Sequence, residues 1–248
     1  MSFTDEEVER YARHLVLREV GGPGQQKLKA ARVLIVGAGG LGSPAALYLA
    51  AAGVGTLILA DPDVIDRSNL QRQIIYAEAD IGQPKAGTAA DRLAALNPHV
   101  FVAGYAGAFD EASADKLVSG VDLVLDGADN FETRMCVNAA CVRHGKPLVS
   151  GAIGRWTGQV GVFRGRPCYQ CLVPEIPPDA ETCVAVGVVG ALAGVIGSMM
   201  ALEAVKLIVD AGDPLAGRLM IYDALAAETR TVRVGADPDC PICGGCTP

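Results

Sequence analysis

Four of the eight cysteines stand in two pairs whose spacing is typical of a metal site. Cys168 and Cys171 form one Cys-x-x-Cys pair, Cys240 and Cys243 form the second, and 68 residues separate the pairs. Four thiolates are the tetrahedral ligand set of structural Zn²⁺, and a closed set of this kind leaves no open position for catalysis. We therefore predict a structural zinc site that ties the C-terminal end of the chain to its body, with redox-active pairs as the alternative.

The other cysteines fall into different sequence contexts. Cys136 and Cys141 lie in a helical pattern, which predicts small core residues, and Cys246 follows two glycines near the end of the chain. Cys183 stands between a proline- and acid-rich loop and an apolar, glycine-rich segment. A thiol at such a junction can be accessible and have a lowered pKa, whereas a buried, inert cysteine is the alternative.

A second candidate site is the glycine-rich stretch at residues 37–42, which reads GAGGLG and matches G-x-G-x-x-G. It lies between an apolar strand pattern and a helical pattern, where backbone N–H groups can approach a phosphate closely. Asp61 follows Gly42 by 19 residues, at the end of the next strand pattern, where a carboxylate can bind ribose hydroxyls. We predict that Gly39, Gly40, Gly42 and Asp61 bind a nucleotide, and on this pattern alone NAD is favoured over ATP.

A polar segment, SNLQRQ at residues 68–73, changes that preference. Arg72 within it and Lys85 after it supply two cations near the same loop. A triphosphate attacked at its α-phosphate needs more charge neutralisation than a dinucleotide, so the two cations favour ATP. Solvent-exposed surface charges are the alternative interpretation. The candidate phosphate-binding residues are Ser68, Asn69, Leu70, Gln71, Arg72 and Lys85.

Acidic residues follow a later strand pattern. Asp126, Asp129 and Asn130 come at or just after its carboxyl end. Mg²⁺ binds to one or two carboxylates together with phosphate oxygens, so Asp129 is our candidate magnesium ligand, with Asn130 beside it in the nucleotide site. The alternative role of Asp129 is to cap the next helix.

Strand and helix patterns alternate over about 120 residues, as they do in a parallel, doubly wound sheet of Rossmann type. In such a sheet ligands bind beyond the carboxyl ends of the strands, where the candidate residues above are expected to meet. The strands are predicted at 32–37, 56–61, 99–105, 121–127 and 147–152, and the helices at 41–52, 67–76, 84–96, 110–119 and 131–144.

The pattern changes after residue 154. Segments 158–163, 218–224 and 229–234 predict a smaller antiparallel addition. At the other end of the chain, Thr4 is expected to cap a helix over residues 5–19 that points Arg13 outward, and the glycine and proline content of residues 21–26 predicts a loop.

Residues 184–202 are 19 residues without a charge and include Gly190-x-x-x-Gly194. By length this segment is a candidate membrane span. Its small residues and the absence of flanking Lys or Arg favour a buried helix that packs closely.

Composition excludes several function classes. Half of the 248 residues are hydrophobic and a fifth are charged, which excludes a mainly disordered chain. The net charge of −7 argues against general binding to nucleic acid or to anionic membranes. The N-terminal residues are charged and lack an apolar core, so we expect a cytoplasmic protein rather than a secreted one.

Taken together, several motifs resemble the MoeB/ThiF/HesA adenylyltransferases, the prokaryotic relatives of ubiquitin-activating enzymes. The resemblance runs from about residue 6 to residue 245. It is carried by GAGGLG, SNLQRQ, Pro84-Lys85, DNFETR at 129–134, the two Cys-x-x-Cys pairs and TCVAVGVVG at 182–190.

The resemblance implies an ATP-dependent adenylation of the C-terminal glycine carboxylate of a small β-grasp sulfur-carrier protein ending in Gly-Gly, with release of pyrophosphate. The pathway it favours is molybdopterin biosynthesis, and the thiamine pathway is the alternative. It implies a single domain over residues 1–248, with a nucleotide-binding half at about 30–152 and a zinc-tethered, carrier-docking half at about 153–248.

The resemblance also implies individual roles. Asp61 would hold the ribose, Asn69, Arg72 and Lys85 the phosphates, and Asp129 would bind Mg²⁺. Arg13 would reach the γ-phosphate of the ATP bound to the partner subunit of a homodimer. Cys183 matches a cysteine that can link covalently to the carrier. Rivals from other classes are an NAD-dependent oxidoreductase and a non-catalytic nucleotide-binding scaffold.

Overall fold

The computed structural model describes residues 3–176 and 187–245. One eight-stranded sheet runs through the molecule in the order β3-β2-β1-β4-β5-β6-β7-β8. The first five strands are parallel, and β6, β7 and β8 continue the sheet antiparallel. The strands are β1 (Arg32–Val36), β2 (Thr56–Ala60), β3 (Phe101–Tyr105), β4 (Leu123–Asp126), β5 (Leu148–Gly154), β6 (Thr157–Phe163), β7 (Arg218–Asp223) and β8 (Glu228–Arg233).

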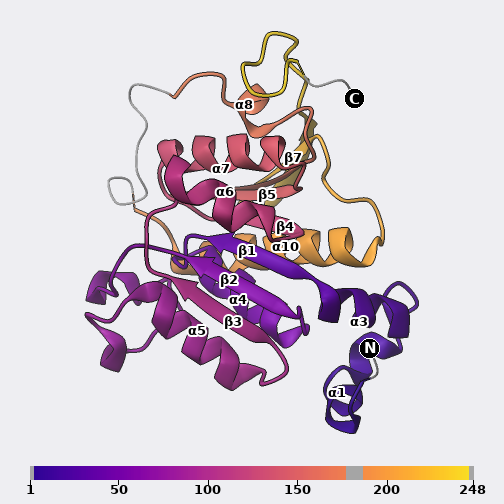
Figure 1. The fold of residues 1–248 in the computed structure, drawn as a ribbon. Helices are drawn as coiled ribbons and strands as arrows, with labels where there is room; N and C mark the ends of the chain where they lie inside the picture. The colour runs from indigo at the N-terminus through magenta and orange to yellow at the C-terminus, as the bar shows by residue number, and fades with distance from the viewer. Residues whose placement is uncertain (1–2, 177–186, 246–248) are drawn as a thin grey trace.

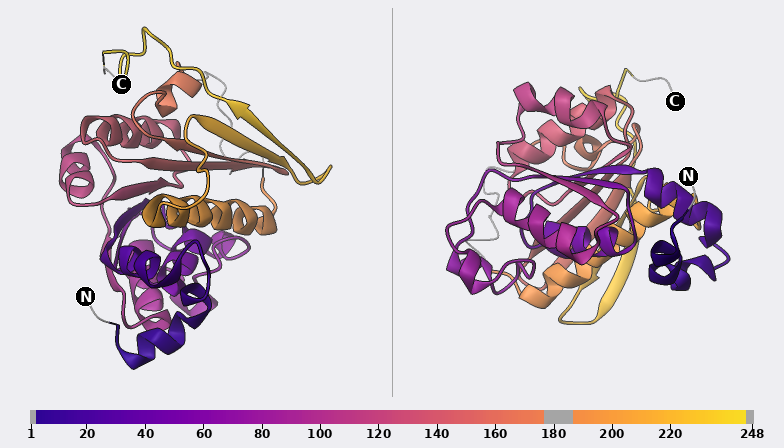
Figure 2. Two further views of the ribbon diagram at one scale, coloured as in Figure 1. Left: turned by 90° about the vertical axis from the view of Figure 1, so that its right-hand side faces the viewer. Right: turned by 60° about the horizontal axis from the view of Figure 1, so that its bottom comes forward.

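Helices cover both faces of this sheet, as Figures 1 and 2 show. Successive residues of a strand point to opposite faces, so β1 sends Val33 and Ile35 into one buried cluster and Leu34 and Val36 into the other. The first cluster lies under α4 (Gly42–Ala51), α5 (Lys85–Leu96) and α10 (Gly190–Val209). The second lies under α6 (Glu111–Ser119) and α7 (Phe131–Arg143). The sequence prediction of a doubly wound, mostly parallel sheet with an antiparallel addition is confirmed.

The N-terminal segment differs from its prediction. The expected helix over 5–19 is two short helices, α1 (Asp5–Arg10) and α2 (Ala12–Leu15), because Tyr11 leaves the helical conformation and buries its ring. The Tyr11 hydroxyl accepts a hydrogen bond of 2.9 Å from Asn97 Nδ2, and the ring fills the space beside Gly53. Thr4 does cap α1, in a capping box with Glu7.

Two further local predictions were wrong. Residues 21–26 are not a loop but the start of α3 (Gly21–Ala30), because burial of Gly24, Gln25 and Leu28 outweighs the low helix propensity of the glycines and the proline. Residues 67–76 form only a 3-10 turn, η1 (Arg67–Asn69), followed by further turns that bury Gln73 and Tyr76. The short helices η2 (Glu78–Asp80) and α8 (Tyr169–Leu172) complete the described elements.

Residues 190–202 of the uncharged segment form the start of α10, which lies along the sheet in Figure 1. By length and composition alone α10 could cross a membrane, yet half of its most apolar window is buried inside the protein. It packs against α4, α3, β5 and β6. The packing against α4 is close at Gly197, where a Cβ would lie 2.5 Å from both the Leu41 carbonyl oxygen and Pro44 Cγ. These contacts support a core helix with small residues.

This packing makes two glycines of α10 respond oppositely to the same substitution. Gly197→Ala is expected to destabilise the protein, since the new methyl group meets the backbone of α4. Gly194→Ala is the matched control, because nothing lies within 4 Å of its Cβ position and alanine in a helix is favoured over glycine by about 0.5–1 kcal/mol. Urea unfolding measures both variants, and equal stability of the two would contradict the proposed packing.

Candidate active site

A pocket of about 320 Å³ opens at the carboxyl ends of β1, β2 and β4. This is the place where a doubly wound sheet binds ligands. Of the candidate residues, it brings together Gly39, Gly40, Asp61, Arg72, Lys85, Asp129 and Asn130. Gly42 stands just behind the pocket wall, and Ser68, Asn69, Leu70 and Gln71 do not line it.

The glycine loop owes its shape to two close backbone approaches. Gly37 has a φ of 87°, and a Cβ there would lie 2.8 Å from the Gly127 carbonyl oxygen. A Cβ on Gly42 would lie 1.8 Å from the Gly37 carbonyl oxygen, so the turn from β1 into α4 closes only with glycine at this position. The Gln73 side chain lies 3.5 Å from the Cβ position of Gly39, and the side chains of Ala193 and Arg72 lie 3.4 Å and 3.5 Å from that of Gly40.

Asp61 sits at the end of β2 and is 5% exposed. Its two carboxylate oxygens accept hydrogen bonds from the backbone N–H groups of Ala38, at 2.8 Å, and Asp63, at 2.9 Å. Burial raises the pKa of Asp61, and the positive charge of Lys85 acts in the opposite direction. The carboxylate therefore anchors the glycine loop and still borders the pocket.

The two predicted cations flank the pocket in different settings. Lys85, the first residue of α5, is nearly buried and donates a hydrogen bond of 2.7 Å to Asp63, whose side chain is 62% exposed. Arg72 is half-buried and donates to the Ser68 carbonyl oxygen at 3.2 Å. The Tyr76 hydroxyl lies 2.9 Å from the Ala38 carbonyl oxygen and 3.1 Å from that of Lys85, so it joins the glycine loop to α5.

The residues just before Arg72 form hydrogen bonds with one another. Asp66 and Asn69 form a capping box around η1, in which Asn69 Oδ1 accepts from the Asp66 N–H at 3.1 Å. The backbone carbonyl of Ser68 accepts a hydrogen bond from the Arg72 guanidinium. These contacts orient the segment that carries Arg72, and a direct nucleotide contact by residues 68–71 stays a prediction.

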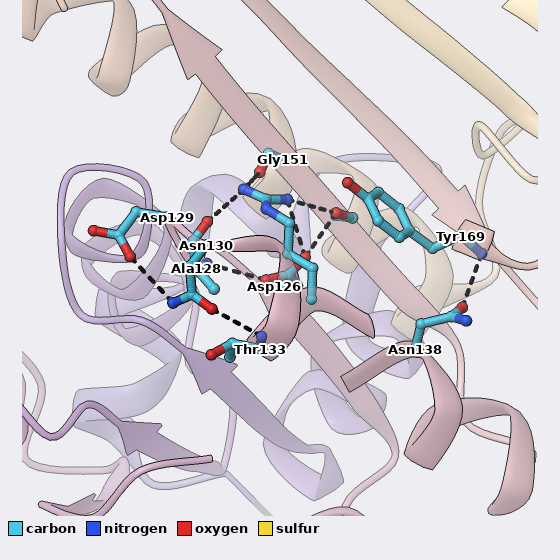
Figure 3. A network of polar contacts seen from close by, with 10 residues as sticks. Asp126, Ala128, Asp129, Asn130, Thr133, Asn138, Gly151 and Tyr169 are labelled. Carbon is cyan, nitrogen blue, oxygen red and sulfur yellow. Dashed lines mark hydrogen bonds and ion pairs between the residues drawn. The ribbon is translucent and has the colours of Figure 1, made fainter. Parts of the chain in front are cut away.

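The three polar residues at and after the carboxyl end of β4, Asp126, Asp129 and Asn130, have separate roles in the structure (Figure 3). Asp126 is 1% exposed and does not face the pocket, contrary to our expectation. Asn130 is the N-cap of α7 and accepts from the Thr133 N–H at 2.8 Å. Asp129 is exposed and lines the pocket, and its one described hydrogen bond comes from Asn130 at 3.4 Å. Of the two aspartates, Asp129 is therefore the one placed to meet a ligand.

Sequence reasoning missed Arg134, which lines the same pocket and is 6% exposed. Its guanidinium donates to Asp126 Oδ2 and Ser150 Oγ, each at 3.1 Å, to the Gly151 carbonyl at 2.8 Å and to the Ala128 carbonyl. Asp126 in turn accepts from Ser150 Oγ and from the Ala128 N–H. Arg134 thus holds the loop that carries Asp129 against β5. Its place in a helical pattern did not distinguish it from a surface arginine.

Arg13 lies far from this pocket within the chain. It is exposed on α2, which packs next to α3. Helix α3 leads into the start of β1 (Figure 1), whereas the pocket is lined by residues at the end of β1. Cys183 and Cys246 lie outside the described residues. Cys141 is buried, as expected for a core residue, and burial raises its pKa and that of the half-buried Cys136.

The four paired cysteines converge at one point. All four sulfur atoms lie within 4.8 Å of one another, with 3.7 Å between Cys168 and Cys240 and 3.4 Å between Cys171 and Cys243. A Zn–S bond of about 2.3 Å in a tetrahedron places sulfurs about 3.8 Å apart, so this set could bind a metal such as zinc. Asn138 of α7 donates to Cys168 Sγ at 3.5 Å and accepts from the Tyr169 N–H at 2.8 Å, which orients this ligand set.

Comparison with known proteins identifies the family. The model of the ThiF family matches residues 11–242. The chain belongs to the ThiF family. It is 47% identical over 253 residues to the sulfur carrier protein adenylyltransferase of Thermus thermophilus, covering 98% of this chain and 93% of that protein. It is 44% identical over 244 residues to the molybdopterin-synthase adenylyltransferase of Escherichia coli, covering 97% and 98%.

A third relative is the SAMP-activating enzyme E1 of Haloferax volcanii, 45% identical over 247 residues and covering 98% of this chain and 92% of that protein. Among solved structures, E. coli MccB with MccA-N7isoASN matches with a TM-score of 0.85 at 23% identity, covering 98% of this chain and 76% of that one. This last similarity shows the fold alone. With family members of this length and identity, the chain is a nucleotidyltransferase, which confirms the predicted enzyme class.

The contacts of Arg134 with Asp126, Ala128 and β5, here called the arginine clamp, can be tested by their effect on the free energy of unfolding. Arg134→Met leaves the Asp126 carboxylate buried without its cation, so we expect a loss of about 3–5 kcal/mol in the free energy of unfolding. The control is Arg143→Met near the other end of α7, where the ion pair with Asp115 is more than half exposed and therefore contributes little to stability. Urea unfolding compares them, and equal losses would refute a buried clamp.

Proposed function

We propose that this protein uses ATP to adenylate the C-terminal glycine carboxylate of a small β-grasp sulfur-carrier protein, with release of pyrophosphate. The observation that carries the proposal is the convergence of the glycine loop, Asp61, Arg72, Lys85 and Asp129 on one pocket. Relatives that match nearly the whole chain are named adenylyltransferases of such carriers, which supports the choice of substrate.

The chemistry suits the residues available. A C-terminal carboxylate is already ionised near neutral pH, so the attack on phosphorus needs no general base. In agreement, the three histidines, His14, His99 and His144, lie outside the pocket. The barrier comes from bringing an anion onto a polyanion, and cations with fixed positions lower it.

Each pocket residue has a proposed role. Backbone N–H groups at Gly39 and Gly40 would hold a phosphate, with Gly42 shaping the turn. Asp61 would accept from the ribose hydroxyls, while Arg72 and Lys85 would neutralise the phosphates. Asp129 would hold Mg²⁺, because it is the exposed carboxylate between the glycine loop and α7. Two cations at one pocket favour a triphosphate over NAD, which argues against the oxidoreductase alternative.

Arg13 requires a second copy of the chain in this proposal. Its exposure at the end of the sheet opposite the pocket agrees with action across a homodimer, where it would reach the γ-phosphate of the ATP bound to the partner subunit. Mixed dimers of Arg13→Ala and Lys85→Ala subunits would then regain part of the activity that each variant lacks alone. Activity that stays absent in the mixture would contradict action across the dimer.

We place the reaction in molybdopterin biosynthesis in the cytoplasm, with the thiamine pathway as the second candidate. The molybdopterin-synthase adenylyltransferase of E. coli and the sulfur carrier protein adenylyltransferase of T. thermophilus resemble the chain about equally. The half of the chain after residue 153 would dock the carrier, and Cys183 is the candidate for a covalent link to it. Exchange assays with both carriers would decide between the pathways.

ATP–pyrophosphate exchange tests the proposal directly. Exchange should appear only when a carrier ending in Gly-Gly is present, and Lys85→Ala should lower it by about 100-fold or more because a phosphate loses its cation. Lys116→Ala, an exposed lysine on α6, is the control and should leave the rate unchanged. Wild-type protein without exchange on any such carrier would refute adenylation.

We propose zinc as the metal of the four-cysteine set, where it would supply a structural cross-link between α8 and the C-terminal segment. Elemental analysis should find about one zinc per chain. Removal of the metal by a chelator should cost about 2 kcal/mol or more, which lowers the Tm by roughly 4 °C or more in a protein of this size. A metal-free preparation with the same Tm would contradict a structural zinc site.

A further inference from the structure

Gln73 is the one residue, among those the structure describes, with a buried side-chain nitrogen or oxygen atom that lacks a hydrogen-bond partner. The atom is Oε1, and the residue as a whole is 4% exposed. Its backbone is paired normally, with its N–H donating to the Asn69 carbonyl at 2.9 Å. The unmatched atom is therefore the side-chain carbonyl oxygen, and the residue that carries it lines the pocket.

An unmatched buried amide costs free energy in the ligand-free protein, because the polar group has left water without gaining a partner. An apolar side chain of similar volume would fill the same space without that cost. The fold therefore gains nothing from the amide at position 73. A buried polar group that costs the fold free energy and stands in a pocket wall calls for an explanation, and contact of the donor end of the same amide with a ligand supplies one.

The surroundings of Gln73 indicate what that partner is. Its Nε2 lies 3.5 Å from the Cβ position of Gly39, and the Arg72 side chain lies 3.5 Å from that of Gly40. Consecutive side chains thus flank consecutive glycines of the loop. The amide nitrogen Nε2 carries two N–H donors, and among the described residues none accepts a hydrogen bond from them. Beside an arginine and a loop rich in N–H groups, the acceptor that fits these donors is an anionic oxygen.

We propose that Gln73 is a catalytic residue whose side-chain amide donates a hydrogen bond to an anionic oxygen of the reacting centre. This inference rests on the proposed function, in which two anions meet at this loop. They are the α-phosphate of ATP and the terminal carboxylate of the carrier. Both present the same chemistry to the amide, and the experiment distinguishes them.

Gln73→Met removes the amide and keeps the volume. The ligand-free variant is expected to have a Tm equal to or above that of the wild type, since the unmatched carbonyl is gone. A hydrogen bond to a charged group corresponds to about 10-fold or more in binding. A rise of that size in the Kd for ATP without carrier identifies the phosphate, and a rise in the KM for carrier at saturating ATP identifies the carboxylate.

Two further variants sharpen the test. Gln73→Glu keeps the shape but replaces the donor with a negative charge, so it should weaken the affected ligand more than Gln73→Met does. Gln26→Met, on the exposed face of α3, is the control for the substitution itself. A Tm of Gln73→Met below that of the wild type would assign the amide a structural role and overturn the proposal, as would unchanged values for both ligands.

These measurements separate the inference from the proposed function. The Tm and the Kd for ATP need no carrier, so a protein that fails to adenylate any carrier can still show the loss of ATP affinity in Gln73→Met. Conversely, normal exchange in Gln73→Met with normal constants for both substrates would leave adenylation intact and refute the role of Gln73.

Discussion

The buried ion pair between Arg134 and Asp126 is the contact on which the geometry of the site depends. Asp126 ends β4, and Ser150 and Gly151 belong to β5. Arg134 donates hydrogen bonds to all three and also to the carbonyl of Ala128. The four described hydrogen bonds use the donors of both terminal nitrogens, so the guanidinium is committed to the protein. The loop that carries Asp129 therefore has a fixed place relative to the strands.

The same constraint explains why the site spans two parts of the sheet. β5 is the last parallel strand and also the first partner of the antiparallel strands that follow, through its register with β6. A clamp on β5 fixes the nucleotide pocket relative to the antiparallel extension. The cysteine cluster adds a second connection, since Asn138 of α7 contacts Cys168 one turn beyond Arg134. One helix thus positions both the pocket loop and the four-cysteine cluster.

Much of the fold could be predicted because its signals are local. Strand and helix alternation, the glycine spacing at residues 37–42 and the two cysteine pairs each depend on neighbours in the chain. The features that sequence reasoning missed depend on distant contacts. Residues 21–26 are helical because they pack under the rest of the protein, and Arg134 and Gln73 differ from surface residues only by what surrounds them. Polar residue types indicate a surface position on average, so a buried arginine or glutamine carries no local signal.

The charges around the pocket are arranged so that the arriving substrate meets cations that the protein has only partly neutralised. Asp126 and Arg134 cancel each other in the interior, whereas Lys85 is nearly buried and its partner Asp63 is mostly exposed. The exposed carboxylate of Asp63 is well solvated when released, so a phosphate can replace it beside Lys85 at small cost. A phosphate could not replace the buried Asp126 beside Arg134 in this way. In the proposed adenylation the two ion pairs therefore have different roles. The inner pair keeps the loop in place throughout the reaction, and the outer pair exchanges one anion for another when ATP binds.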